Sequence, residues 1–512
     1  MKYPLGVQTF EKLRNGGYVY IDKTELMYKL VNEGVYFFLG RPRRFGKSLF
    51  VSTLEAYFSG RYDLFEGLAV SKEETKWEKY PILHLDFSGE NYLEEDALKT
   101  VLNRMLTEWE TEYGIVDNDN TLSGRFAAII KSAYIKTGKK VVILVDEYDK
   151  PILDLYDNTV LEDDNRTLLK AFYGVMKKQD RYIQFAFLTG VTKLGKVSVF
   201  SDLNNITDIS LRDDYCSICG ITEQELHQTF DEEVGVLADE NGMTKDECYT
   251  ELAQQYDGYH FSRKSVGVYN PYSLLMALQA RFFNDFWYET GTPTYLIKIL
   301  KEIGGTIPDL NEVLATFSSL GKIEVYKDDI ISLLYQSGYL TIKEVLSIRL
   351  VKLGYPNMEV QRRFTEDLVS LYMGITSKEA SIYVEQFATD LKRGDAQSFM
   401  ERMKAFFDGG DYRIAGEKEL YFQNVFHTVC RMLSLAGKAE EATSNGRLDY
   451  VLQNPKYVYI VEFKYDGSAA EALKQINDKG YADPFKKDSR KLFKIGVNFS
   501  SETRSISEWV IE

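Results

Sequence analysis

The sequence predicts an α/β protein with a parallel sheet domain, a helical middle region and a C-terminal α/β domain. In the first half of the chain, short apolar runs alternate with amphipathic stretches, which is typical of a parallel sheet covered by helices on both faces. Strand patterns become sparse from about residue 221 to 400 and then return. A chain of 512 residues is too long for one core. We therefore expect domains over residues 1–220, 221–300, 301–408 and 409–512.

The strands of the first sheet are expected in short apolar segments that end in glycine or near an acidic residue. These are VYFFLG (35–40), PILHLDF (81–87), KVVILVDE (140–147) and IQFAFLTG (183–190). Helical patterns lie between them, for example in SLFVSTLEAYFSG (48–60) and NRTLLKAFYGVMKKQ (165–179). Because each strand is followed by a helix, parallel pairing is expected.

The middle of the chain is expected to be mostly helical. TEQELHQTF (222–230) opens on a threonine that suits a helix cap, and ISLLYQSGYLTI (331–342) predicts a helix followed by a turn at Gly338. Residues 221–300 are expected to form a helical lid over the first domain. Residues 301–408 are expected to form a helical, winged-helix-like coupler.

The last domain boundary is expected near Gly409 and Gly410, where the pattern changes. A helix over 417–436 precedes two paired strands, joined through Asn454 and Pro455. A second helix and a last strand follow. The segments are GRLDYVLQ (446–453), YVYIVEFKY (457–465), the helix over 469–480 and LFKIGVNF (492–499).

Composition restricts the possible functions. The formal net charge of −15 repels nucleic acid, so such a partner needs a local basic patch. No run approaches the roughly 18 apolar residues that span a membrane, and the first residues lack a signal-peptide core. The cytoplasm is the expected location, and no membrane partner is expected. Cys216 and Cys219 are interpreted as two buried thiols rather than a zinc site.

RPRRFGKSLF (41–50) has most features of a phosphate-binding loop. It follows a predicted strand and opens a predicted helix, so backbone N–H groups and the helix N-terminus can hold phosphate oxygens. Arg41 replaces the usual first glycine, and Pro42 removes one N–H donor. The expected nucleotide contacts are Arg41, Pro42, Arg43, Arg44, Phe45, Gly46, Lys47, Ser48 and Leu49, with Lys47 reaching the outer phosphates and Ser48 offering its hydroxyl to Mg²⁺.

A second motif supports a nucleotide site. In VVILVDEYDK (141–150), Asp146 ends a buried strand and can hold Mg²⁺, while Glu147 can orient or deprotonate the attacking water. About a hundred residues separate the two motifs, which suits adjacent strands. Thr189 lies at the end of another strand, where a polar side chain can interact with the γ-phosphate. For Thr189 and Thr192 a purely structural role is equally open.

Three segments together resemble the prokaryotic AAA-ATPase-like family over roughly residues 3–300. They are YVYIDKTELMYKLVNEGVYFFLGRPRRFGKSLF (18–50), LVDEYDKPI (144–152) and GVTKLGKVSVFSDLNNITDI (190–209). The family carries RPRRFGKS as its phosphate loop, so Arg41 fits its pattern. The resemblance implies a P-loop NTPase domain that binds and hydrolyses ATP, with Lys47 and Ser48 on phosphate and Mg²⁺, Asp146 on the metal and Glu147 as the catalytic acid. It also covers YDGYHFS (256–262) and VYNPYSLL (268–275), without assigning them a role.

The roles of Arg43 and Arg44 stay open at this point. Their side chains can steady phosphate or replace an arginine finger, and they can equally pair with acids such as Asp149. A finger supplied by another subunit would require an oligomer.

A second group of residues with metal chemistry lies near the end of the chain. Glu462 and Lys464 are two positions apart on a predicted strand, so they share a face, and Asp449 lies on the preceding strand. Two carboxylates about 4 Å apart repel by roughly 4 kcal/mol at an effective dielectric near 20. A divalent cation, Mg²⁺ or Mn²⁺, offsets this repulsion and activates water for phosphodiester hydrolysis.

These residues resemble the PD-(D/E)XK nuclease superfamily, a restriction-endonuclease-like fold, over about 415–500. EFK (462–464) is intact, and the PD half is reduced to Asp449. The resemblance implies that Gln475 and Tyr481 flank the site and that Glu419, or alternatively Glu417, completes it. Lys486, Lys487, Arg490, Lys491 and Lys494 form either a patch that steers phosphate or a solvated helix end.

The favoured function is ATP binding and hydrolysis coupled to a metal-dependent nuclease that acts on DNA or RNA. The fusion suggests a bacterial role in defence or in nucleic-acid processing. The alternative is an ATP-gated signalling or scaffold module whose nuclease-like domain binds without cleaving.

Overall fold

The computed structural model divides the chain into two compact units, residues 1–295 with 309–359 and residues 296–308 with 360–512. The residues that it describes are 1–114, 119–155, 158–193, 205–264, 266–288, 296, 299, 310, 313–321, 323, 330–409, 425–426, 428–430, 433, 440–442, 450–503 and 505–512.

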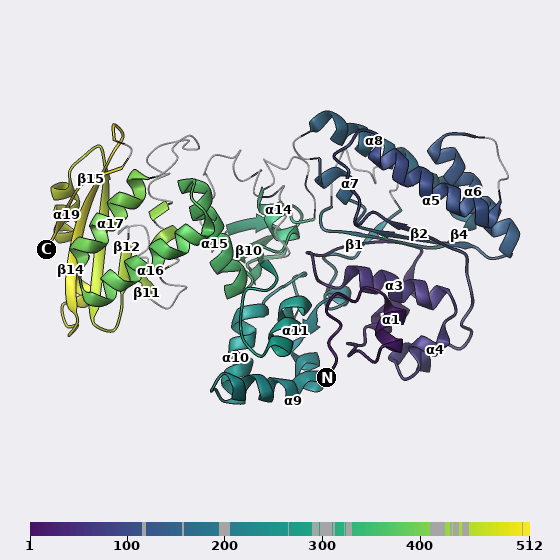
Figure 1. The fold of residues 1–512 in the computed structure, drawn as a ribbon, viewed down its shortest axis with the longest axis horizontal. Helices are drawn as coiled ribbons and strands as arrows, with labels where there is room; N and C mark the ends of the chain where they lie inside the picture. The colour runs from purple at the N-terminus through teal and green to yellow at the C-terminus, as the bar shows by residue number, and fades with distance from the viewer. Residues whose placement is uncertain are drawn as a thin grey trace. The chain divides into compact units, whose positions relative to one another are not determined.

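The first unit contains the predicted parallel sheet (Figure 1). Its strands are β1 (Tyr36–Gly40), β2 (Ile82–Asp86), β3 (Val141–Asp146), β4 (Ile183–Gly190) and β5 (Thr207–Asp208), in the order β2-β3-β4-β1-β5. All the pairings are parallel. Every residue of β3 is buried, as expected for a strand covered on both faces. The predicted strand positions are confirmed.

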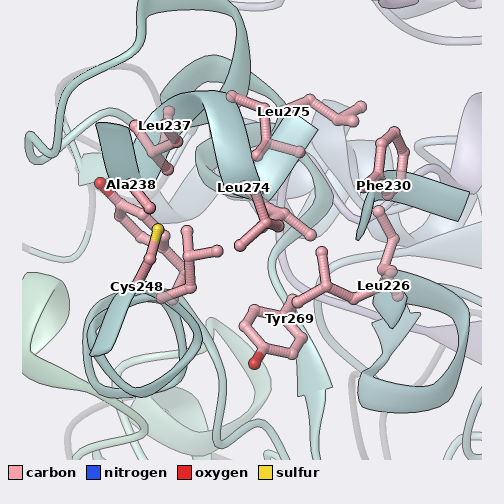
Figure 2. Packing of buried hydrophobic residues seen from close by; sticks show 14 of the residues in the cluster. Leu226, Phe230, Leu237, Ala238, Cys248, Tyr269, Leu274 and Leu275 are labelled. Atoms are coloured by element: carbon pink, nitrogen blue, oxygen red, sulfur yellow. The ribbon is translucent and has the colours of Figure 1, made fainter. Parts of the chain in front are cut away.

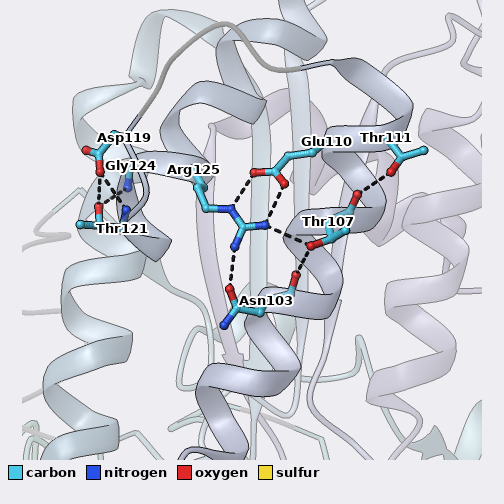
Figure 3. Close-up of polar contacts among 8 residues, drawn as sticks. All are labelled: Asn103, Thr107, Glu110, Thr111, Asp119, Thr121, Gly124 and Arg125. Atoms are coloured by element: carbon cyan, nitrogen blue, oxygen red, sulfur yellow. Dashed lines mark hydrogen bonds and ion pairs between the residues drawn. The ribbon is translucent and has the colours of Figure 1, made fainter.

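Helices cover both faces of this sheet (Figure 1). On one face lie α5 (Ala97–Tyr113), α6 (Leu122–Thr137) and α8 (Thr159–Lys178); on the other lie α1 (Phe10–Asn15), α3 (Lys47–Phe58) and α4 (Tyr62–Phe65). Figure 3 shows how α5 and α6 are joined. The Arg125 guanidinium donates to both carboxylate oxygens of Glu110, at 2.7 and 2.8 Å, and to the Asn103 amide oxygen at 2.6 Å. Such bidentate pairs fix geometry as well as adding energy.

The strand order corrects one expectation from the sequence. The two motif strands β1 and β3 are not adjacent, because β4 lies between them. The spacing of the strands along the chain does not determine their order in the sheet, because all of them are similar apolar runs. The carboxyl ends of parallel strands still share one edge of the sheet, so the loops after β1, β3 and β4 meet there.

The helices after the sheet form a separate apolar core (Figure 2). These are α9 (Glu223–Glu240), α10 (Lys245–Tyr256) and α11 (Pro271–Ala280). Leu226 and Phe230 of α9 pack with Cys248 of α10 and Leu274 of α11. The Thr222 hydroxyl caps α9, as predicted, and Glu225 completes a capping box.

The remaining elements of this unit are short. They are α2 (Thr24–Glu33), α7 (Lys150–Leu153), the 3₁₀ turns η1 (Ala69–Lys72), η2 (Asp180–Tyr182) and η3 (Asp213–Tyr215), and the paired strands β6 (Ile221–Thr222) and β7 (Val268–Tyr269). Besides its helices, the middle region contains an antiparallel sheet, β8-β10-β9, that the sequence did not predict. Its strands β8 (Val313–Thr316), β9 (Thr341–Val345) and β10 (Leu350–Gly354) are too short for a clear alternating pattern. The predicted helix and turn are confirmed as α14 (Ile330–Gln336) and Gly338, whose φ is +90°.

The second unit combines helices with a mixed sheet. Its helices are α15 (Met358–Met373), which begins in the first unit, α16 (Ser377–Arg393), α17 (Ala396–Asp408) and α19 (Ala469–Asp478), with the turn η5 (Asp483–Phe485). Its sheet has the order β11 (Glu440–Ala442), β12 (Tyr450–Gln453), β13 (Tyr457–Tyr465), β14 (Lys491–Ser500) and β15 (Ser505–Ile511). The predicted hairpin is confirmed, because β12 and β13 pair antiparallel. The strand that was expected to be last is followed by β15, which corrects that expectation.

Candidate nucleotide site and candidate nuclease site

The loop between β1 and α3 has the strand–loop–helix layout of a phosphate-binding loop. Gly46 adopts a left-handed φ of +92°, which costs a glycine little. Arg44 also has a left-handed φ, of +65°, and this is unfavourable for a residue with a side chain. Strained backbone of this kind persists only where the surroundings hold it, and it gathers at functional sites.

Lys47, the first residue of α3, lies over this loop. Its ammonium donates to the carbonyl oxygens of Arg41 at 3.1 Å and Pro42 at 3.0 Å. Burial lowers the pKa of Lys47, while Asp146 and Glu147 act in the opposite direction. The buried cation therefore lies within the field of the acids that end β3.

Asp146 and Glu147 lie where the sequence placed them, at the end of β3. Asp146 is buried, and burial raises its pKa, while hydrogen bonding with Ser48 and the charge of Lys47 oppose the rise. Burial also raises the pKa of Glu147, whose backbone is left-handed with a φ of +51°. A hydroxyl and a carboxylate held together are hard oxygen donors, the set that Mg²⁺ prefers.

A cavity of about 450 Å³ opens at this loop. Six of the predicted nucleotide-contact residues line it, namely Arg43, Arg44, Gly46, Lys47, Ser48 and Leu49. Glu147 and Asp149 line it from the loop after β3, and Tyr272 of α11 lines it as well. The Arg44 guanidinium lies 5.2 Å from the centre of the Tyr272 ring. Within the described part of the chain neither Arg43 nor Arg44 forms an ion pair, so their suggested pairing with Asp149 is not seen.

A smaller apolar cavity of about 100 Å³ lies beside the first one. Both cavities are lined by Gly46, Leu49 and Leu275. The smaller one is closed by Tyr20 and Phe230, among other apolar side chains. An apolar slot next to a polar one suits a ligand with a flat ring at one end and charge at the other.

Arg41 does not line either of these cavities, because its side chain is buried elsewhere. Its guanidinium donates to the carbonyl oxygens of Ser210 at 2.8 Å and Tyr215 at 3.2 Å, and it lies 4.1 Å from the Phe261 ring centre. Burial lowers the pKa of Arg41. Arg41, which replaces the usual first glycine, therefore anchors the loop to the segment after β5.

The two threonines near the end of β4 are buried and bond within the protein. The Thr189 hydroxyl donates to the Leu39 carbonyl oxygen at 2.8 Å. The Thr192 hydroxyl donates to Asp149 Oδ2 at 2.9 Å. These contacts favour the structural interpretation of both threonines.

The YDGYHFS segment, which had no role from sequence, packs against Phe45 of the phosphate loop. The Phe45 ring lies 4.8 Å from that of Tyr259 and 5.4 Å from that of Phe261, both edge-on. Trp287 also reaches the loop, through its indole N–H. No periodicity in the sequence indicates these contacts, because they join residues that are far apart in the chain.

In the second unit, three predicted residues lie together. Lys464 Nζ donates to Gln475 Oε1 at 2.6 Å, and Gln475 Nε2 donates to Glu462 Oε1. Glu462 is only 3% exposed. Gly496 permits this contact between helix and sheet, since a Cβ there would lie 2.2 Å from the Ala469 carbonyl oxygen of α19.

Other predicted nuclease residues are not part of this group. Asp449, Glu419 and Glu417 lie outside the described residues. Tyr481 packs in the apolar cluster of Val451 and Ile476. Among the described residues no group of three or more His, Cys, Asp or Glu side chains is arranged to hold a metal ion.

Much of the basic patch near residues 484–494 is paired with acids. Arg490 is held by Asp488 at 2.6 Å, and Lys494 by Glu512 at 3.0 Å. Lys486 pairs with Asp483 at 2.8 Å. These ion pairs favour the solvated-surface interpretation over a free patch that steers phosphate.

The fold defines an α/β protein whose first sheet carries the strand–loop–helix layout of a P-loop, with a C-terminal mixed-sheet domain. The family model described as predicted AAA-ATPase matches residues 4–200. The model of the PD-(D/E)XK nuclease superfamily matches residues 417–509. A protein of Azotobacter chroococcum mcd 1, described as "Uncharacterized protein in vnfD 5'region", is 36% identical over 524 residues, which cover 100% of this chain and 99% of that protein. The chain belongs to this family of AAA-ATPase-like proteins with a C-terminal PD-(D/E)XK nuclease superfamily domain.

No helix in the described ranges is both long and apolar enough to cross a lipid bilayer.

Proposed function

We propose that the protein binds and hydrolyses ATP at the phosphate loop and that this cycle controls a metal-dependent nuclease in the C-terminal domain. The observation that carries the proposal is the convergence of Lys47, Ser48 and Glu147 on one cavity of about 450 Å³ beside the buried Asp146. The triphosphate would occupy this cavity. The base would occupy the apolar cavity beside it, which shares Gly46 and Leu49 with the first.

The chain's own groups supply most of the hydrolytic chemistry. Lys47 and the N–H groups at the start of α3 stabilise charge on the outer phosphates. Ser48 and Asp146 would hold Mg²⁺, which when bound neutralises charge on the β- and γ-phosphates. Glu147 accepts a proton from the attacking water, and its raised pKa brings it closer to the range in which a general base is effective. Arg43 and Arg44 steady the transferred phosphoryl group.

The proposed nuclease chemistry uses Glu462, Lys464 and Gln475, with Asp449 and Glu419 completing the site. The carboxylates would hold Mg²⁺ or Mn²⁺, which when bound lowers the pKa of a water ligand. Lys464 stabilises the negative charge that develops on the phosphate. Gln475 positions both Lys464 and Glu462, because it bonds to each of them. DNA and RNA are both open as substrates, in defence or in nucleic-acid processing.

The experiment measures ATP turnover and nuclease activity of the same preparation. Purified protein with Mg²⁺ or Mn²⁺ is assayed on single- and double-stranded DNA and RNA, with and without ATP. Glu147→Gln should abolish ATP turnover, and Glu462→Ala should abolish cleavage. Lys12→Ala and Glu502→Ala, which alter exposed residues away from both sites, serve as matched controls.

The alternative is a signalling or scaffold module whose nuclease-like domain binds without cleaving. The pairing of much of the basic patch with acids favours this candidate, because it weakens the attraction for nucleic acid. Intact ATP turnover with no cleavage of any substrate supports the alternative. Cleavage that persists in Glu462→Ala would indicate a contaminating nuclease.

A further inference from the structure

The phosphate loop is held by residues that follow it far along the chain. Trp287 Nε1 donates to the Arg43 carbonyl oxygen at 2.9 Å, across 244 residues of sequence. Phe45 packs edge-on against both Tyr259 and Phe261. Contacts therefore hold the residues immediately before and after the strained residue Arg44.

The bond from Trp287 determines which way one peptide group faces. A trans peptide is planar, and its C=O and N–H point in opposite directions. Because the Arg43 carbonyl points toward Trp287, the N–H of Arg44 points away from it. In a phosphate-binding loop such N–H groups are the anion ligands. Without the indole donor, the left-handed Arg44 loses one of the contacts that hold it.

Trp287 is in turn held by a buried acid, Glu359. The backbone N–H of Trp287 donates to Glu359 Oε1 at 2.6 Å, and the Ser273 hydroxyl bonds to Glu359 Oε2 at 2.8 Å. The Ser273 hydroxyl also accepts from the Trp287 N–H at 3.1 Å. Glu359 is 0% exposed and lies in the first turn of α15. This residue therefore fixes the Trp287 backbone inside the core.

We propose that Trp287 and Glu359 are positioning residues of the nucleotide site. They hold the Arg43–Arg44 peptide so that the Arg44 N–H and guanidinium face the triphosphate, without touching the nucleotide themselves. The inference rests on the proposed function, in which this cavity binds a nucleoside triphosphate. Neither residue belongs to a motif that sequence reasoning linked to phosphate binding.

The test measures affinity for the non-hydrolysable analogue AMP-PNP with Mg²⁺ by isothermal titration calorimetry of the full-length protein. Trp287→Phe removes the N–H donor and keeps an aromatic ring, and it should weaken binding about 5- to 100-fold because the partly buried Arg43 carbonyl loses its donor. Glu359→Leu should weaken binding in the same range. Glu359→Gln keeps an acceptor oxygen for the Trp287 N–H and should bind like the wild type.

Two further variants separate positioning from packing. Tyr339→Phe removes only the hydroxyl of a ring whose centre lies 5.6 Å from that of Trp287, and it should leave the affinity unchanged. Ser273→Ala removes only the bridging hydroxyl and should weaken binding about 2- to 5-fold. Ser273→Ala decides the question if the larger substitutions prevent folding, and an unchanged affinity in this variant would then overturn the inference.

The outcomes distinguish this inference from the proposed function. If the wild type and Lys47→Ala both fail to bind AMP-PNP, the proposed function is wrong. If the wild type binds, Lys47→Ala does not, and Trp287→Phe and Glu359→Leu bind like the wild type, the positioning role is wrong and the nucleotide site stands. Equal weakening by Glu359→Gln and Glu359→Leu would also contradict it.

Discussion

Asp149, after β3, accepts hydrogen bonds on one carboxylate oxygen from both the N–H and the hydroxyl of Thr192, at 2.7 and 2.9 Å. The N–H of Val191 donates to the same oxygen at 3.0 Å. A side chain at Gly190 would be blocked, because a Cβ there would lie 2.4 Å from Asp149 Oδ1. This buried carboxylate therefore ties the acidic loop after β3 to the end of β4, which lies between the two motif strands.

Removing the Thr192 hydroxyl should loosen this connection. Thr192→Val keeps the side-chain volume and leaves Asp149 with one fewer donor in a buried site. We expect the free energy of unfolding to fall by about 1–3 kcal/mol, measured by urea denaturation. Thr207→Val, at an exposed position of β5, is the control and should change stability by less than about 0.5 kcal/mol. Equal stability of the two variants would show that the contact contributes nothing.

Lys47 should be required for binding of the triphosphate. Lys47→Met leaves the buried carbonyl oxygens of Arg41 and Pro42 without this donor, so we expect it to unfold at a lower temperature than the wild type in the absence of nucleotide. Adding Mg²⁺ and AMP-PNP should raise the melting temperature of the wild type only. A nucleotide-induced rise in Lys47→Met would remove Lys47 from the proposed phosphate site.

Glu359 should make the stability of the first unit depend on pH. Burial raises the pKa of Glu359 from 4.5 to about 8, and Asp285 adds to the rise, while hydrogen bonds from Ser273 and Trp287 oppose it. A raised pKa in the folded state contributes stability that is fully present below pH 4.5 and is lost as the pH rises through 8.

Between pH 6 and 9 the wild type should therefore lose about 2–3 kcal/mol relative to Glu359→Gln, which cannot ionise. Urea denaturation of both proteins at several pH values measures this difference. Parallel stability curves for the two proteins over this range would mean that Glu359 is ionised in the folded protein at neutral pH.

The first sheet could be predicted because its buried strands are continuous apolar runs. VVILVD in β3 is buried at every position, and no surface helix or half-exposed strand has that pattern. The strand order was not predictable, because the insertion of β4 between β1 and β3 depends on how the strands pack in space. The middle sheet was not predicted for a related reason. Only Thr341 and Ile342 of β9 are buried, and two residues are too few to show the alternating pattern of a strand.

The candidate nucleotide site was predictable in part. Lys47, Ser48 and Glu147 lie at the ends of regular elements, where sequence position fixes the place of the side chain. Arg41 and Phe45 lie in an irregular loop with no periodic pattern. Neither lines the cavity of about 450 Å³, although Phe45 lines the apolar cavity beside it. The role of Trp287 could not be predicted from the sequence, because its contact with the loop joins distant parts of the chain.

Gln475 bonds to both Lys464 and Glu462. Residues that orient metal ligands and catalytic groups matter nearly as much as the ligands themselves, and their loss typically costs 10- to 100-fold in metal affinity or activity. Gln475→Ala should therefore lower the cleavage rate by about 10- to 100-fold and leave ATP turnover at the wild-type rate. Gln475→Glu would place a second acid beside the buried Glu462, and it should lower the rate most at high pH, where both acids ionise.

Both variants are assayed with Mn²⁺ over a range of metal concentrations, with Glu502→Gln as the exposed control. If excess Mn²⁺ restores cleavage by Gln475→Ala, the role of Gln475 lies in metal binding through Glu462. If it does not, the role lies in holding Lys464 against the phosphate. Wild-type cleavage by Gln475→Ala at all Mn²⁺ concentrations would contradict both roles and leave the contact as simple packing of α19 on the sheet.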